Sequence, residues 1–266
     1  MGLPPAIALF LISHWQLSVF FQSVFLHRYA SHRMFRMSHF WERCFHLATY
    51  VTQGSSYLRP EAYALLHRLH HAHADTPRDP HSPTVHTTPL KLMAAMKKNY
   101  EDISRRGVVP DASLAGNAPV WRALDDWGTS YASSAVWIAL YTSFYVVFAS
   151  AWWQYLLLPI HFAMGPLHGT IVNWFGHYRG YRNHATNDES RNTLPIEILT
   201  MGELFQNNHH HRPANPNFAS RWFEIDPAYP VLVLLDRIGI IQLQPVDAHG
   251  LRQPGRTLGF DSSTAR

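Results

Sequence analysis

The 266-residue chain contains a single cysteine, Cys44. One thiol cannot form an internal disulfide, and it cannot supply the ligands of an iron–sulfur cluster. Charge is also scarce, because Asp, Glu, Lys and Arg make up 15% of the residues, and none of them occurs in residues 1–27 or 127–178. The composition gives no indication of disorder, so we expect one folded unit in which polar segments separate two long uncharged runs.

Both uncharged runs are long enough to cross a membrane. Because a helix needs roughly 20 apolar residues to span the hydrocarbon core, they predict spans at residues 5–26, 131–149 and 155–176. Buried helices of a soluble protein are the alternative. A secretory signal peptide is excluded, since the first run lacks a basic start and a small-residue cleavage site.

Arginines gather at one end of two of these spans. They follow the first span at Arg28, Arg33, Arg36 and Arg43, and the third span at Arg179, Arg182 and Arg191. The opposite ends carry no charge. By the positive-inside rule the polar part of the chain is expected to face the cytoplasm.

These patterns predict an all-α integral membrane protein with a single domain over residues 1–266. It has about three transmembrane helices, an interfacial or re-entrant helix at residues 44–58, and a cytoplasmic helical cap. The cap comprises residues 28–126 and 179–246, and residues 247–266 form a loose tail. Within the cap we expect helices at 61–73, 91–106 and 231–243, a proline-rich loop at 75–89 and a connector at 107–126.

Several of the 19 histidines fall into clusters with ligand-like spacing. His27 and His32 lie about 140° apart around a regular helix, so both can face one metal only if the helix ends between them. The second cluster lies within an arc of about 100° on one helical face and comprises His67, His70 and His71.

Two further groups lie late in the chain. Asn173 and His177 are four residues apart, hence on one face at the end of the last span. The segment QNNHHH contributes Gln206, His209 and His210.

So many clustered imidazoles would be poorly satisfied without a cation, and neutral imidazole suits iron and zinc. The chain has neither the His-Glu-x-x-His motif of zinc proteases nor the Glu-x-x-His repeat of carboxylate di-iron bundles. We therefore predict a His-rich di-metal site whose ligands are His27, His32, His67, His70, His71, Asn173, His177, Gln206, His209 and His210. Three histidines flank the clusters and are alternative metal ligands: His73, His81 and His211. We expect the remaining histidines to have ordinary hydrogen-bonded roles: His14, His39, His46, His86, His161, His168, His184 and His249.

The order H-x-x-x-x-H, H-x-x-H-H, N-x-x-x-H and a final H-H resembles the membrane fatty acid desaturase family. The flanks HADTPRDPHSP, GELFQNNHHHRP and RWFEIDP resemble its acyl-CoA, stearoyl-CoA desaturase-like branch. Only one predicted span precedes the first box, as in a compact bacterial type of the inner membrane or in a chain that begins short. In the family the last box usually reads H-x-x-H-H, and Gln206 replaces its first histidine.

The resemblance implies O2-dependent insertion of a cis double bond into a fatty acyl chain, at the delta-9 position, with acyl-CoA or acyl-lipid as substrate. It also implies two iron ions, with the eight clustered histidines as catalytic ligands and Asn173 acting through water. Electrons would come from a separate ferredoxin, rubredoxin or cytochrome, because the chain has no cytochrome-b5-type His-Pro-Gly-Gly segment. Membrane lipids are expected partners and nucleic acid is not.

Two alternatives remain. A fatty acyl or lipid hydroxylase would use the same scaffold, and histidine spacing does not separate it from a desaturase. A non-enzymatic membrane zinc protein would need closed tetrahedral sites, and the ligands here outnumber those that one or two such sites use.

Overall fold

The computed structural model describes residues 5–246 of the chain. It is mostly helical, as the sequence predicts; the predicted tail and His249 lie outside the described residues. The elements in chain order are α1 (Pro5–Phe21), the π-helix η1 (Gln22–Ser31), β1 (Phe35–Met37), α2 (His39–Gln53), the 3-10 helix η2 (Gly54–Ser56), α3 (Pro60–His73), α4 (Pro89–Ser104), the 3-10 helix η3 (Ala112–Leu114), α5 (Arg122–Gly128), α6 (Tyr131–Phe148), the 3-10 helix η4 (Trp152–Leu157), α7 (Leu158–Phe162), α8 (Met164–Tyr178), α9 (Gln206–His211), α10 (Ala228–Arg237) and β2 (Ile241–Leu243).

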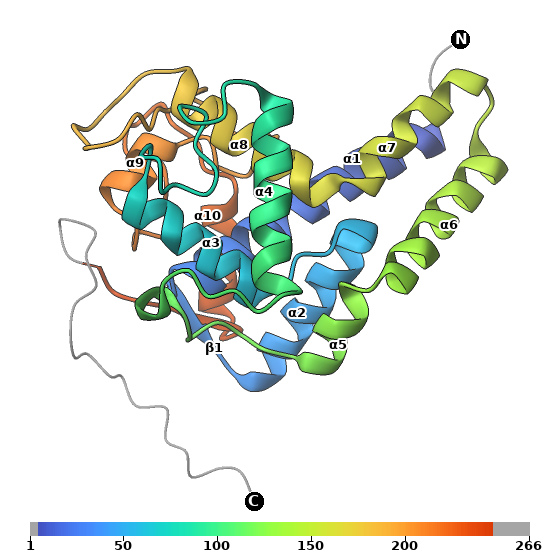
Figure 1. Ribbon diagram of the computed structural model, residues 1–266, viewed down its shortest axis with the longest axis horizontal. Coiled ribbons are helices and arrows are strands. Elements are labelled where there is room, and N and C mark those ends of the chain that lie inside the picture. Colours follow the sequence, from blue (N-terminus) through green and yellow to red (C-terminus); the bar gives the residue numbers. More distant parts are fainter. Residues whose placement is uncertain (1–4, 247–266) are drawn as a thin grey trace, which may run out of the picture.

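The membrane part is an arm built from α1, α6 and α7 that extends from a larger helical cap (Figure 1). By length and apolar composition, Ala6–Ser31 and Tyr131–Phe148 can each cross a membrane. Much of α6 faces outward with bare aliphatic side chains, such as Val146 and Val147. Such a surface is stable in lipid and would be costly in water.

The third predicted span is not one straight helix. Trp152–Phe162 and Met164–Tyr178 are bent by 74° relative to each other. Pro166 causes the break, because it has no N–H to donate to the carbonyl of Phe162. Ser55 Oγ donates to that carbonyl instead, at 3.1 Å.

The first span also departs from the prediction. The regular α-helix ends at Phe21, before His27, and a π-helix continues the chain to Ser31. Each turn of a π-helix closes five residues apart, and the N–H of His32 donates to the carbonyl of His27 at 3.2 Å. His27 and His32 therefore face the same side without the helix ending midway between them.

The structure corrects the expected position of Arg28. The positive-inside argument places it on the cytoplasmic surface, yet its side chain is fully buried. It donates to Asp226 Oδ2 at 2.7 Å and to Glu203 Oε1 at 3.2 Å. A buried guanidinium needs such partners, so Arg28 links the first span to the cap and does not contact lipid headgroups.

In the cap, α3 and α4 match the expected ranges within two residues. The helix expected at residues 231–243 is wrong in its second part, because α10 ends at Arg237, Gly239 has a φ of 75°, and Ile241–Leu243 form strand β2. The sequence did not predict the short antiparallel sheet in which Phe35, Arg36 and Met37 pair with Leu243, Gln242 and Ile241. An apolar core beneath the histidines joins η1, the sheet, α2 and α10. Its buried members are Val24, Phe25, Leu26, Tyr29, Met34, Phe35, Phe45, Phe205, Phe218, Ala228, Leu232 and Ile241.

Candidate metal centre

The structure brings the eight clustered histidines together as two adjacent groups. The first, the five-histidine site, comprises His27, His32, His67, His71 and His209. The second, the three-histidine site, comprises His70, His177 and His210. Within each group the potential ligand atoms lie within 4.8 Å of one another.

One helical face serves both groups, as the spacing of the second box indicates. Helix α3 directs His67 and His71 into the five-histidine site and His70 into the three-histidine site. Helix α9 does the same with its neighbours His209 and His210. The two sites are thus held side by side by the same two helices.

The nitrogens of the five-histidine site converge more closely than hydrogen bonding alone can explain. His71 Nε2 lies 2.9 Å from both His67 Nε2 and His209 Nε2. His67 Nε2 is also 2.6 Å from His32 Nε2, and His209 Nε2 is 3.0 Å from His27 Nε2. A single ring nitrogen carries one proton or one lone pair, so it cannot satisfy two such neighbours at once. A cation among the rings would satisfy all five lone pairs, so the donor set fits a metal ion.

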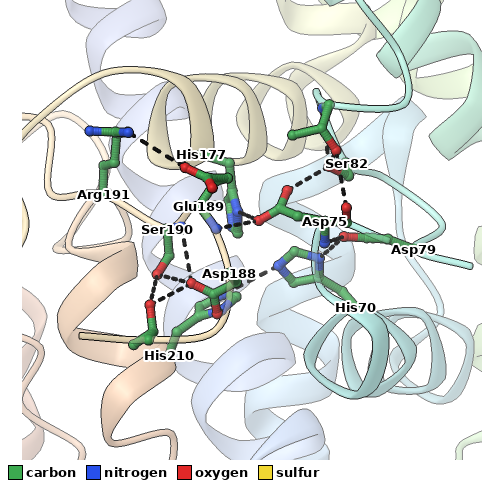
Figure 2. Close-up of polar contacts among 12 residues, drawn as sticks. His70, Asp75, Asp79, Ser82, His177, Asp188, Glu189, Ser190, Arg191 and His210 are labelled. Carbon is green, nitrogen blue, oxygen red and sulfur yellow. Dashed lines mark hydrogen bonds and ion pairs between the residues drawn. The ribbon is translucent and has the colours of Figure 1, made fainter. Parts of the chain in front are cut away.

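Carboxylates fix the orientation of all three rings in the three-histidine site (Figure 2). His70 Nδ1 donates to Asp79 at 2.9 Å, His177 Nδ1 to Asp75 at 2.9 Å and His210 Nδ1 to Asp188 at 2.7 Å. A proton held on Nδ1 leaves Nε2 as a bare lone pair, which is the form that binds metal. His177 Nε2 is buried without a hydrogen-bond partner, as expected of an atom reserved for a ligand.

In the five-histidine site, one carboxylate among the described residues accepts a hydrogen bond from the Nδ1 atom of a histidine ring. Glu203 accepts from His27 Nδ1 and from Ser23 Oγ. Burial acts to raise the pKa of Glu203, but His27, Arg28 and Ser23 lower it below its usual value. Glu203 therefore stays ionised and holds the ring of His27 in place.

Charge and burial favour neutral rings in both sites. Burial, together with the neighbouring imidazoles, holds the pKa well below its usual value for His67, His70, His71 and His209. Burial resists ionisation of Asp75 and Asp188 as well, yet the hydrogen bonds that they accept hold the pKa of each below its usual range. Neutral imidazoles beside ionised carboxylates are what a divalent cation requires.

The two predicted amide ligands lie beside the histidines. Asn173 donates to the carbonyl of Gly169 at 2.8 Å, and Gln206 donates to the carbonyl of Glu203 at 2.6 Å. Both line a cavity of about 30 Å³ that His27 and His67 also line. That volume holds about one water molecule, so an amide–water–metal contact has room. Metal ligation by these ten residues stays a prediction.

The sequence does not identify the four carboxylates as partners of the histidines, and it gives His81 only as an alternative ligand. Asp75, Asp79 and His81 all lie in the segment HADTPRDPHSP that follows the second histidine cluster. The ring of His81 packs against His70 with centroids 4.5 Å apart, and its Nε2 is buried without a partner. Polar residues spaced closely after a histidine box were the available signal.

A larger cavity of about 480 Å³ runs from the histidines towards the membrane arm. His67, His81 and Asn173 line it on the metal side. Met93 and Met96 of α4 and the α7–α8 junction supply apolar walls. Lys97 and Arg105 also line it and are exposed, so the cavity opens to the surface beside them.

The sequence of the chain is similar to those of known proteins. The model of the fatty acid desaturase family matches residues 2–233. A delta-9 desaturase-like 2 protein of Arabidopsis thaliana is 26% identical over 219 residues, covering 80% of this chain and 68% of its own. A hex-5-enoyl-[acyl-carrier protein] acetylenase of Moorena producens is 26% identical over 254 residues, covering 87% and 74% respectively.

A sn-1 stearoyl-lipid 9-desaturase of Synechocystis sp. is likewise 26% identical, over 230 residues, covering 84% of this chain and 67% of its own. The family match covers nearly all of the chain, including every histidine of both sites. The chain is a membrane protein and an oxidoreductase, and it belongs to the fatty acid desaturase family.

Proposed function

We propose that the protein inserts a cis double bond at the delta-9 position of a saturated fatty acyl chain carried by coenzyme A, using two iron ions and O2. The observation that carries the proposal is that two adjacent imidazole sites lie beside a large, mostly apolar cavity, which His67 of the five-histidine site lines. The five-histidine site would hold one iron, with water beside Asn173 and Gln206 next to His27 and His67, and the three-histidine site would hold the other. When bound, the iron ions supply the O2 activation that breaks two unactivated C–H bonds.

The overall reaction balances only with an external reductant. Two hydrogens from neighbouring acyl carbons, one O2, two electrons and two protons give an alkene and two waters. The sequence has one cysteine and no cytochrome-b5-type His-Pro-Gly-Gly segment, so a separate ferredoxin, rubredoxin or cytochrome is the proposed electron donor. We also propose that the site faces the cytoplasm of a bacterial inner membrane.

The residues of the chain act by positioning. The carboxylates Asp75, Asp79 and Asp188 keep a proton on Nδ1 of each ring of the three-histidine site, which keeps Nε2 available. Helix α4 covers the large cavity with Met93 and Met96 and limits access of water to an acyl chain there. Since a saturated chain has no polar group near its middle, contacts at its headgroup and the length of the cavity would set the reacting carbons.

Positive charge at the opening of the large cavity is the basis for proposing coenzyme A as the acyl carrier. Lys97 and Arg105 at the opening suit an anionic headgroup such as a coenzyme A thioester. Relatives are named for different carriers, including an acyl-lipid and an acyl-carrier protein. Supplying the purified enzyme with stearoyl-CoA and stearoyl-lipid together, under one reducing system, and measuring which of them becomes unsaturated distinguishes these carriers.

The first test is expression in a host membrane followed by gas chromatography and mass spectrometry of fatty acid methyl esters. We expect a new delta-9 monounsaturated species that disappears in a His70→Ala variant present at equal level in the membrane. Hydroxylated chains would instead assign the protein to the hydroxylases that the sequence left open. Full turnover by His70→Ala would refute the metal assignment.

A further inference from the structure

An exposed apolar surface lies on the cap, outside the predicted spans but beside the first of them. We call it the apolar loop patch; its members are Leu194, Ile196, Ile198, Leu199, Trp222 and Ile225. All six are exposed, with Trp222 at 95% and Leu199 at 66% of their full accessible surface. Isolated apolar side chains are common on protein surfaces, but six exposed ones on two neighbouring segments indicate a binding surface.

Backbone pairing makes the patch one surface although its two segments are distant in sequence. Ile196 and Ile225 form a parallel bridge. The N–H of Ile225 donates to the carbonyl of Pro195 at 2.9 Å, and the N–H of Glu197 donates to the carbonyl of Ile225 at 3.3 Å. Residues 194–199 and 222–225 therefore move together as one structural unit.

The carboxylates in this unit are satisfied internally. Glu197 is buried and accepts from the N–H of Leu194 and from Thr200 Oγ1. Glu224 is also buried and accepts from Tyr181 Oη at 2.7 Å. The unit thus buries and pairs its charged groups while its aliphatic side chains point outward, which suits an environment poor in water.

The patch is continuous with the transmembrane surface. Trp15 Nε1 donates to the carbonyl of Leu199 at 2.8 Å. Trp15 lies near the middle of the span Ala6–Ser31, on the order of 15 Å along the helix from His27. Leu199 thus lies alongside the membrane-spanning helix, closer to the middle of the membrane than the metal centre is.

We propose that the apolar loop patch is immersed in the bilayer leaflet on the side of the metal centre, and that lipid acyl chains are its partner. Trp222 and the neighbouring Arg221 would lie at the headgroup level, where Trp is enriched and where Arg reaches the phosphates. The cap would then be held by the spans and by this second anchor. The proposal rests on membrane location and not on the desaturase reaction, so its test needs no turnover.

The test measures depth with single cysteines, because Cys44→Ser removes the one native thiol. In that background, Ile198→Cys and Trp222→Cys are labelled with a nitrobenzoxadiazole dye and reconstituted into phosphatidylcholine–phosphatidylglycerol vesicles containing doxyl-labelled lipid. Two references bracket the result. Val146→Cys, at a 65% exposed position of α6, reports the membrane, and Lys98→Cys, whose native side chain is 72% exposed, reports water.

We expect the dyes at residues 198 and 222 to be quenched by doxyl lipid at least two-fold more than the dye at 98. The dye at 198 should resist aqueous iodide like the dye at 146, and the dye at 222, at the headgroup level, should show a resistance between those at 98 and 146. Quenching by iodide as at residue 98 would overturn the proposal. A patch built for a protein partner would give this second result, since the vesicles contain no other protein. Matching melting temperatures of the labelled variants in detergent confirm that each is folded.

Discussion

Replacing Asp75 by asparagine should weaken metal binding at the three-histidine site by about ten-fold. Asp75 accepts from His177 Nδ1 at 2.9 Å, from Ser82 Oγ at 2.6 Å and from the N–H of Glu189 at 2.8 Å. Asparagine keeps the size and tolerates the positive φ of 61° at this position. Its carbonyl can still accept from His177, and Ser82 can rotate to accept from its amide, so the change removes mainly the negative charge.

The magnitude follows from that charge. A hydrogen bond to a charged group contributes about 1.5–3 kcal/mol and a neutral one about 0.5–1.5 kcal/mol. The midpoints of these ranges differ by about 1.25 kcal/mol, which is close to ten-fold in a binding constant and at the lower end of the roughly 10- to 100-fold effects seen for groups that orient metal ligands.

The assay is a titration of the metal-free protein with Zn2+ against a chromophoric chelator, with iron content measured separately by mass spectrometry. Asp102→Asn is the matched control, because Asp102 pairs with Lys98 and Arg106 on the surface of α4. Asp75→Asn combined with His177→Ala should lose little more than His177→Ala alone, since Asp75 acts through that ring. Unchanged Zn2+ affinity in Asp75→Asn, or full additivity in the pair, would refute the reasoning.

Three further substitutions probe other parts of the chain. Gln206→His should slow loss of metal to a chelator, because imidazole binds iron better than an amide does, and an unaltered rate would place Gln206 outside the ligands. His161→Phe should lower the free energy of unfolding in detergent by about 1–3 kcal/mol, since Tyr145 Oη, 2.9 Å from His161 Nε2, loses its partner; an unchanged melting temperature would contradict this. Arg28→Met should cost about 3–5 kcal/mol by leaving the buried Asp226 without its cation, and Arg36→Met on the partly exposed strand β1 should leave chemical unfolding nearly unchanged; equal unfolding curves for the two variants would show that the buried ion pair is not needed.

The parts of the fold that depend on local sequence could be predicted. Absence of charge over residues 131–149 predicted α6, and the spacing of His67, His70 and His71 predicted one helical face shared by two sites. Both are properties of neighbouring residues, and the physics of helices and membranes acts on them directly.

Long-range pairings could not be predicted. Arg28 follows an apolar run and looks like a headgroup contact, but its carboxylate partners lie 175 and 198 residues later in the chain. The strand Phe35–Met37 pairs with residues more than 200 positions away and has no turn beside it to indicate a sheet. Only tertiary structure brings such partners together.

The candidate site lies between these cases. Its histidines could be recognised as clusters, whereas their division into groups of five and three depends on how four separate segments meet. The carboxylates Asp75, Asp79 and Asp188 carry no spacing that distinguishes them from loop residues. Only their contacts with His177, His70 and His210 reveal their role.

The π-helix Gln22–Ser31 changes how length variation in this segment should be understood. In ordinary α-helix, side chains four apart share a face, whereas here the shared face falls every five residues. Removing one residue between His27 and His32 would shorten their spacing to four and allow an α-helix to present both rings together. A related gene with the shorter spacing could therefore encode the same pocket, and an alignment that treats the gap as loss of a ligand pair would misjudge it.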